Sequence, residues 1–230
     1  MLKVNDLEIE YPDGTRAVDG VGFSLEKGEN IALIGANGAG KTSLLLSLVG
    51  VLQYIGGEIK LGDMLLDKKT LRQFRSKIGM VFQNPDDQLF MPNIYEDAAF
   101  GPRSFGCNEE ETARRVNTAL SKLGIEHLST RSPLKLSGGE KRLAAISTVL
   151  AMEPDILLFD EPTAFLDPRA RRNMIHTLKD LPQGKIIATH DTAFASELCT
   201  RVLLLQEGKL IADESIDLLH DKERLEAAGL

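Results

Sequence analysis

The sequence predicts an α/β fold with a mainly parallel sheet, an N-terminal antiparallel β lobe and an inserted α-helical subdomain. Short apolar strands alternate with helical segments through much of the chain, which is the pattern of a parallel sheet covered on both faces. Residues 2–25 instead alternate apolar and polar residues around a turn at Asp13 and Gly14, as an antiparallel hairpin does. Only helical patterning occurs between about residues 90 and 150.

The predicted strands after the hairpin are short and apolar. In chain order they read "NIALIG", "GEIKLG", "KIGMVFQ", "DILLFD", "KIIATH" and "RVLLLQ". The first of them leads through a glycine-rich loop into the helical stretch "KTSLLLSLVGVL".

Further helices are predicted in the middle and in the C-terminal half of the chain. They extend from about Ile94 to Phe105 with an interruption at Gly101 and Pro102, from Asn108 to Leu123, from Ser137, from about Pro168 to Leu181, and from about Thr192 to Cys199. Asn108 and Glu111 form a cap pair at the start of the second helix, and Gly124 ends it.

Length and composition indicate one folded domain over residues 1–230. The chain is 43% hydrophobic and 27% charged, as ordinary globular proteins are. We expect a core of about residues 1–88 and 152–230 and a helical subdomain of about residues 89–151. Cys107 and Cys199 have no metal-like spacing, which favours packing roles in a reducing compartment.

Charge argues weakly against one functional class, without excluding a local basic patch, and hydropathy argues against another. The net charge of -7 argues against a dedicated nucleic-acid binder, so no nucleic-acid partner is expected. No uncharged run reaches the ~20 apolar residues of a membrane span, and the N-terminus has no apolar secretion segment. We therefore expect a cytoplasmic chain that does not cross a membrane alone.

The segment "GANGAGKT", Gly35 to Thr42, follows an apolar strand and opens a helix, as the phosphate-binding P-loop does. Its glycines let backbone N–H groups surround phosphates, Lys41 reaches the β- and γ-phosphate oxygens, and the Thr42 hydroxyl binds Mg2+. The pattern therefore predicts a P-loop NTPase that uses ATP and Mg2+. The nucleotide-binding residues expected here are Gly35, Asn37, Gly38, Ala39, Gly40, Lys41, Thr42 and Ser43.

The strand "DILLFD" ends in two acids. On its own this pattern also fits a solvated loop, but with a P-loop upstream Asp160 is expected to order the Mg2+ shell and Glu161 to act as general base. His190 and Gln83 likewise follow predicted strands, at the sheet edge where ligands bind. Either residue is equally compatible with a loop residue that hydrogen-bonds locally.

The segment "LSGGEKR", Leu136 to Arg142, opens the helix predicted from Ser137 and is called the signature below. Ser137 and Glu140 fit a capping box, which needs no ligand. Gly138 and Gly139, however, weaken a first helical turn by roughly 1 kcal/mol each relative to alanine and leave N–H groups bare. A phosphate would suit those N–H groups better than a plain cap does.

Together with "FLDP" and "ATHD", these motifs resemble the nucleotide-binding subunit of ABC transporters over nearly the whole chain. The resemblance implies a head-to-tail homo- or heterodimer in which Ser137, Gly138, Gly139 and Glu140 of one subunit close over ATP on the P-loop of the other.

The resemblance also implies individual roles. Tyr11 would stack on adenine, Gln83 would contact magnesium, Asp167 would contact the partner, and His190 would act as a γ-phosphate switch. Phe165 departs from the smaller residue that is usual before "LD".

The segments "FQNPDDQLF" and "YEDAAFGP" resemble the ATPases of energy-coupling-factor importers, which take up cobalt, nickel or vitamins. That likeness implies transmembrane partner subunits on the inner face of the membrane. We expect them to dock near residues 86–105, where Leu89, Phe90 and Phe100 are apolar; a core position is the alternative for these side chains.

Two other functional classes share parts of this pattern. A soluble ABC ATPase acting on nucleic acid or the ribosome typically has two cassettes or a long coiled-coil insert, and neither is expected here. An inactive scaffold with the same fold would not need Lys41, Asp160, Glu161 and His190 together.

Overall fold

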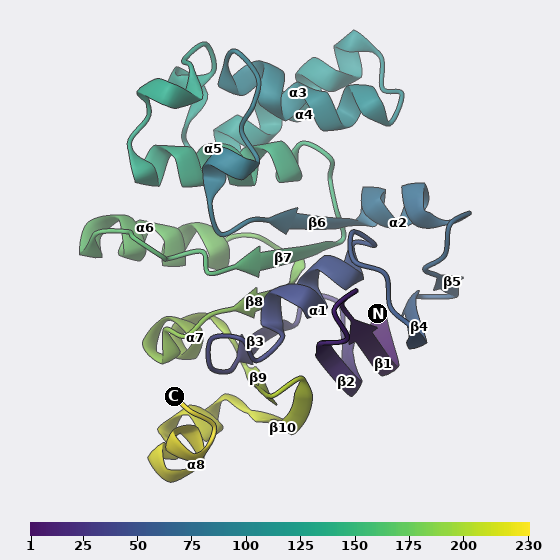
Figure 1. The fold of residues 1–230 in the computed structure, drawn as a ribbon. Helices are drawn as coiled ribbons and strands as arrows, with labels where there is room; N and C mark the ends of the chain where they lie inside the picture. Colours follow the sequence, from purple (N-terminus) through teal and green to yellow (C-terminus); the bar gives the residue numbers. More distant parts are fainter.

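A six-stranded sheet carries the predicted apolar strands in the computed structural model, which describes residues 1–230 (Figure 1). Its order is β10-β9-β3-β8-β7-β6. The strands are β3 (Asn30–Ile34), β6 (Ile78–Val81), β7 (Ile156–Asp160), β8 (Gly184–Ala188), β9 (Arg201–Gln206) and β10 (Lys209–Ser215). All pairs are parallel except β9 with β10, so the predicted mainly parallel sheet is confirmed.

The N-terminal hairpin belongs to a second, antiparallel sheet of order β2-β1-β4-β5. Its strands are β1 (Leu2–Glu10), β2 (Arg16–Leu25), β4 (Gly56–Leu61) and β5 (Met64–Leu65). A register shift lies between Val4 and Leu7 of β1, where Asp6 has a φ of 44°. Because this bulge changes the alternation by one residue, Leu2 and Val4 are buried on the same side as Leu7 and Ile9.

Helices cover both faces of the parallel sheet. The α-helices are α1 (Lys41–Leu48), α2 (Leu71–Lys77), α3 (Ile94–Ser104), α4 (Glu109–Lys122), α5 (Gly138–Leu150), α6 (Pro168–Lys179), α7 (Thr192–Leu198) and α8 (Lys222–Ala227). Short 3-10 helices are η1 (Pro85–Asp87), η2 (Glu126–Leu128), η3 (Pro133–Lys135) and η4 (Ile216–His220). None of them combines the length and apolar character that crossing a membrane requires.

Two hydrophobic layers follow from the period-two alternation of the central strands. Ile31 and Leu33 of β3 pack with the antiparallel sheet and α1, whereas Ala32 and Ile34 pack with the core that α5, α6 and α7 share. Figure 1 shows α3, α4 and α5 as a block beyond β6, at the edge of the sheet. The inserted helices are therefore observed, and the proposed limits of a separate subdomain stay a prediction.

Pro102 lies inside α3, so the predicted interruption at Gly101 and Pro102 is wrong. The helix continues to Ser104 and ends only two residues after the proline. A Cβ on Gly101 would lie 2.7 Å from Met152 Cγ. This glycine therefore permits close packing against the turn that follows α5, and it does not break the helix.

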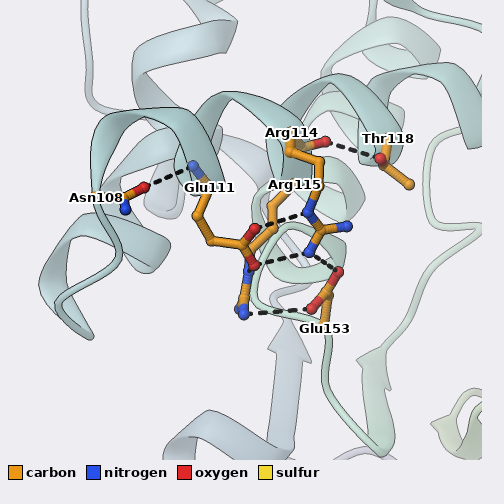
Figure 2. A network of polar contacts seen from close by, with 6 residues as sticks. All are labelled: Asn108, Glu111, Arg114, Arg115, Thr118 and Glu153. Carbon is orange, nitrogen blue, oxygen red and sulfur yellow. Dashed lines mark hydrogen bonds and ion pairs between the residues drawn. The ribbon is translucent and has the colours of Figure 1, made fainter.

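The predicted cap at Asn108 is present, and α4 is tied to the end of α5 (Figure 2). The Asn108 side chain accepts a hydrogen bond from the Glu111 N–H at 2.9 Å. The Glu111 carboxylate pairs with Arg114 and Arg115, and both arginines also contact Glu153 beyond α5. These hydrogen bonds lower the pKa of Glu111 to about 2.

We expect Asn108→Ala to lower the free energy of unfolding by about 1 kcal/mol, because the first turn of α4 loses its side-chain acceptor. Urea denaturation would measure this loss. The matched control is Asn117→Ala, since Asn117 is exposed within the same helix and accepts no cap hydrogen bond. An equal loss in both variants would contradict the capping role.

Candidate functional site

A cavity of about 410 Å³ lies where β3, β6, β7 and β8 end, beside the antiparallel sheet. Its lining includes the predicted residues Tyr11, Asn37 to Ser43, Gln83, Asp160, Glu161 and His190. Thr15, Arg16 and Ala17 of the hairpin complete it and were not predicted. Parallel strands place their carboxyl ends at one edge, and this explains why residues so distant in sequence meet here.

The P-loop glycines are required by close backbone contacts. A Cβ on Gly40, which has a φ of 101°, would lie 2.1 Å from the carbonyl oxygen of Ala17. A Cβ on Gly35 would lie 2.4 Å from the carbonyl oxygen of Leu205. Gly35 thus lies against β9 and does not line the cavity, while Gly40 turns the chain into α1.

The Lys41 ammonium group is held by its own loop. Nζ donates to the carbonyl oxygens of Gly35 at 2.6 Å and Ala36 at 3.1 Å. Burial lowers the pKa of Lys41, and the nearby Glu161 and Asp160 carboxylates oppose that shift. Because an ammonium group has three donors, one N–H is left for an anion in the cavity.

Asp160 and Thr42 meet at the inner wall of the cavity. The Thr42 hydroxyl donates to Asp160 Oδ2 at 2.8 Å. Burial raises the pKa of Asp160 above its ordinary value, against the opposing effects of the hydrogen bond from Thr42 and the charge of Lys41. A hydroxyl, a carboxylate and the nearby Gln83 amide are hard oxygen donors of the kind that Mg2+ prefers, so the residues present fit this ion.

Glu161 is held at a strained position directly after β7. It has a φ of 45° and is 7% exposed. Its Oε1 lies 2.9 Å from His190 Nδ1, and its Oε2 accepts a hydrogen bond from the buried Thr189 hydroxyl at 3.1 Å. Thr189 was missed by the sequence analysis, although a hydroxyl residue at the end of the buried strand "KIIAT" could have indicated it.

Tyr11 lies at the rim of the cavity, half-buried, on the turn of the N-terminal hairpin. Its hydroxyl is 2.9 Å from Ser43 Oγ in α1. The hydrogen bond fixes the aromatic ring relative to the P-loop helix.

The signature lies outside this cavity. Ser137 and Glu140 form the predicted capping box: the Ser137 N–H donates to Glu140 Oε2 at 2.8 Å, and the Glu140 N–H donates to Ser137 Oγ at 3.4 Å. A Cβ on Gly138 would meet no atom within 4 Å, and one on Gly139 only the Ala170 Cβ at 3.5 Å. Packing inside this chain therefore requires neither glycine.

A separate surface hollow of about 220 Å³ joins Ser137, Gly139 and Glu140 to Asp167. Asp167 caps α6 by accepting the N–H groups of Arg169 at 2.8 Å and Ala170 at 2.9 Å. The chain thus has two distinct polar regions, one around the P-loop and one around the signature.

Comparison with known proteins identifies the family. Residues 18–164 match the ABC transporter family model. A putative ABC transporter ATP-binding protein of Geobacter sulfurreducens is 49% identical over 93% of this chain and 86% of its own length. The energy-coupling factor transporter ATP-binding protein EcfA of Methanothermobacter thermautotrophicus is 42% identical over 100% of this chain and 76% of its own.

Two solved structures share the fold. CbiO1 of Clostridium perfringens, described as part of the ABC transporter complex CbiONQ, has a TM-score of 0.86 and 37% identity over 97% of this chain and 92% of its own. A dimeric ATP-binding cassette with ADP and phosphate bound has a TM-score of 0.83 and 26% identity over 94% and 99%. The chain therefore belongs to the ABC transporter family, as an ATPase of the kind that couples ATP hydrolysis to transport and that resembles the energy-coupling-factor ATPases.

Proposed function

We propose that this chain binds MgATP in the P-loop cavity, closes head to tail with a second ATPase subunit, and drives a membrane importer of the energy-coupling-factor type. The observation that carries the proposal is that Lys41, the Thr42–Asp160 pair and the Glu161–His190 pair face one cavity. The solute is a transition metal ion such as cobalt or nickel, or a vitamin. The name of EcfA supports the energy-coupling-factor type, and the description of CbiO1 as part of an ABC transporter complex supports the presence of partner subunits.

Each residue has a defined task in hydrolysis. The loop N–H groups and Lys41 bind the phosphates, and Tyr11 stacks on the adenine. Thr42, Asp160 and Gln83 would hold Mg2+, which would supply positive charge against the phosphates. Glu161 accepts a proton from the attacking water as the water oxygen bonds to the γ-phosphorus. The bond between that phosphorus and the ADP oxygen breaks, which gives ADP and phosphate.

His190 contacts the γ-phosphate and, through Nδ1, holds the Glu161 carboxylate toward the same end of the cavity. Thr189 holds the other carboxylate oxygen. The base is therefore fixed on both oxygens before water enters.

The second nucleotide contact comes from the signature of the other subunit. Its two glycines have no packing role within their own chain, and its N–H groups begin a helix whose dipole favours an anion. The hollow that the signature shares with Asp167 gives this face a polar surface of its own.

The membrane partner docks on the segment of residues 86–105. Phe90 and Phe100 are 65% and 47% exposed, and their rings meet edge to face at 5.2 Å. Leu89 is 7% exposed and belongs to the core, so its expected place on the docking surface is wrong. Asp97 Oδ1 accepts the N–H groups of Phe90 and Met91, both at 2.9 Å, and so holds the loop that presents Phe90.

The first test of this function is Glu161→Gln. Gln retains the hydrogen-bonding shape but cannot accept the proton, so we expect MgATP binding to persist while turnover falls by roughly 10²- to 10⁴-fold. Calorimetric binding and phosphate release would measure the two quantities. Normal steady-state hydrolysis by this variant would remove Glu161 from the role of general base.

The second test mixes two inactive proteins, Lys41→Ala and Ser137→Arg. In the proposed dimer each ATP site is formed by the P-loop of one subunit and the signature of the other, so both sites of either homodimer contain a defect. In a mixed dimer both substitutions fall in the same site, and the other site is intact. We expect mixing to restore measurable ATP hydrolysis. The accompanying control is ATP-dependent dimerisation of Glu161→Gln; failure of both assays, including with the natural partner subunit, would refute binding across the dimer.

The third test concerns docking. We expect Phe90→Ser combined with Phe100→Ser to keep ATPase activity and to abolish co-purification of the membrane subunits. Leu89→Ser is the contrasting variant, because loss of this buried side chain should cost about 2 to 5 kcal/mol of stability. Retained co-purification by the double variant would place the docking surface elsewhere.

A further inference from the structure

Arg142, at the end of the signature, is a buried cation with no carboxylate partner. It lies in the second turn of α5 and is 3% exposed. Its Nη1 donates to the carbonyl oxygens of Gln83 at 2.6 Å and Glu161 at 3.4 Å, and its Nη2 donates to that of Ala164 at 2.9 Å. Its Nε has no hydrogen-bond partner.

The three carbonyls come from different parts of the site. Gln83 follows β6, Glu161 follows β7, and Ala164 lies in the loop that leads to Asp167. A planar guanidinium group can reach all three because its donors form a rigid fork. Arg142 is thus the single side chain that joins α5 to both strand ends.

Burying a guanidinium group without a direct ion pair is costly, and the charge of the Glu161 carboxylate offsets the burial only in part, since the pKa of Arg142 is still lowered. Its location therefore needs an explanation. A structural role is one, and Lys185 provides the comparison. Lys185 is 1% exposed and also donates to carbonyl oxygens, those of Leu181 at 2.6 Å and Gln183 at 2.9 Å. It lies at the beginning of β8, at the end of the sheet away from the P-loop cavity.

We propose that Arg142 is a positioning residue for hydrolysis in its own chain, which fixes the backbone of Gln83 and Glu161 relative to each other and to α5. It does not line the P-loop cavity and acts through those two residues. The inference rests on the proposed ATPase function. It assigns the buried cation a task that the P-loop, the acids and His190 do not perform.

The consequence of losing Arg142 differs from that of losing a P-loop residue. Lys41 and the loop N–H groups, which bind the phosphates, do not contact Arg142. Most of the affinity for MgATP should therefore persist, and only the contribution of the Gln83 contact with Mg2+ should weaken. The backbone at Glu161 and at Gln83, in contrast, loses its common anchor. A displacement of about 1 Å in a catalytic group can reduce turnover on the order of a hundredfold.

The experiment compares the full-length variants Arg142→Gln, Arg142→Lys and Lys185→Gln with the wild type. Thermal unfolding, MgATP affinity and kcat are measured on each. We expect Arg142→Gln to lose on the order of a hundredfold in kcat and far less in MgATP affinity, because the P-loop contacts to the phosphates remain. Arg142→Lys should recover part of kcat, because an ammonium group keeps the charge but cannot span all three carbonyls. Lys185→Gln should lower the melting temperature and leave kcat unchanged.

Three results would overturn the proposal. The first is a folded Arg142→Gln protein whose kcat equals that of the wild type. The second is an equal loss of MgATP affinity and kcat. The third is failure of both Arg142 variants to fold, since the role would then be structural; if only Arg142→Gln fails to fold, the same criteria apply to Arg142→Lys. Absence of ATP hydrolysis by the wild type would instead contradict the proposed function.

Discussion

The parallel register of the central strands is the constraint on which the candidate site depends. Asp160, the last residue of β7, pairs with Ala188 of β8, and Ala188 pairs with Leu33 of β3. The residues that follow these strands must therefore emerge at one edge of the sheet. This is why the P-loop, the two acids and His190 meet although more than a hundred residues separate the first from the last. Displacing one strand by a single residue would separate Glu161 from the Thr189 hydroxyl that holds it.

Much of the fold could be predicted because buried strands and capped helices leave local signals. β3, β7, β8 and β9 are short apolar runs, and α4 and α5 begin at cap residues. β10 could not be predicted in this way, since Ala212 is its only buried residue and its position depends on pairing with β9. The interruption predicted at Pro102 was wrong because the effect of a proline depends on its distance from the end of the helix, and that end is set by packing against neighbouring segments.

The same distinction applies to the candidate site: residues in contiguous motifs could be predicted, and residues defined by contacts between distant segments could not. The P-loop and the two acids at the end of β7 are contiguous motifs, so their residues could be named from sequence, and all but Gly35 line the cavity. Thr189 and Arg142 make their contacts with segments that are distant in the sequence. The sequence does not indicate how close α5 lies to the ends of β6 and β7, so these contacts could not be predicted from it. Leu89 and Phe90 are adjacent apolar residues with opposite exposure, which only the path of the loop after η1 determines.

Helix α5 connects the two polar regions of the chain. Its first turn presents Gly138 and Gly139 outward, where nothing in the same chain requires their lack of a side chain. One turn later Arg142 points inward and holds the backbone of Gln83 and Glu161. A helix is stiff over so short a distance, since its backbone hydrogen bonds join every residue to the next turn. In the proposed head-to-tail dimer, an anion bound to the first turn would therefore contact the same short helix that holds the backbone of Glu161.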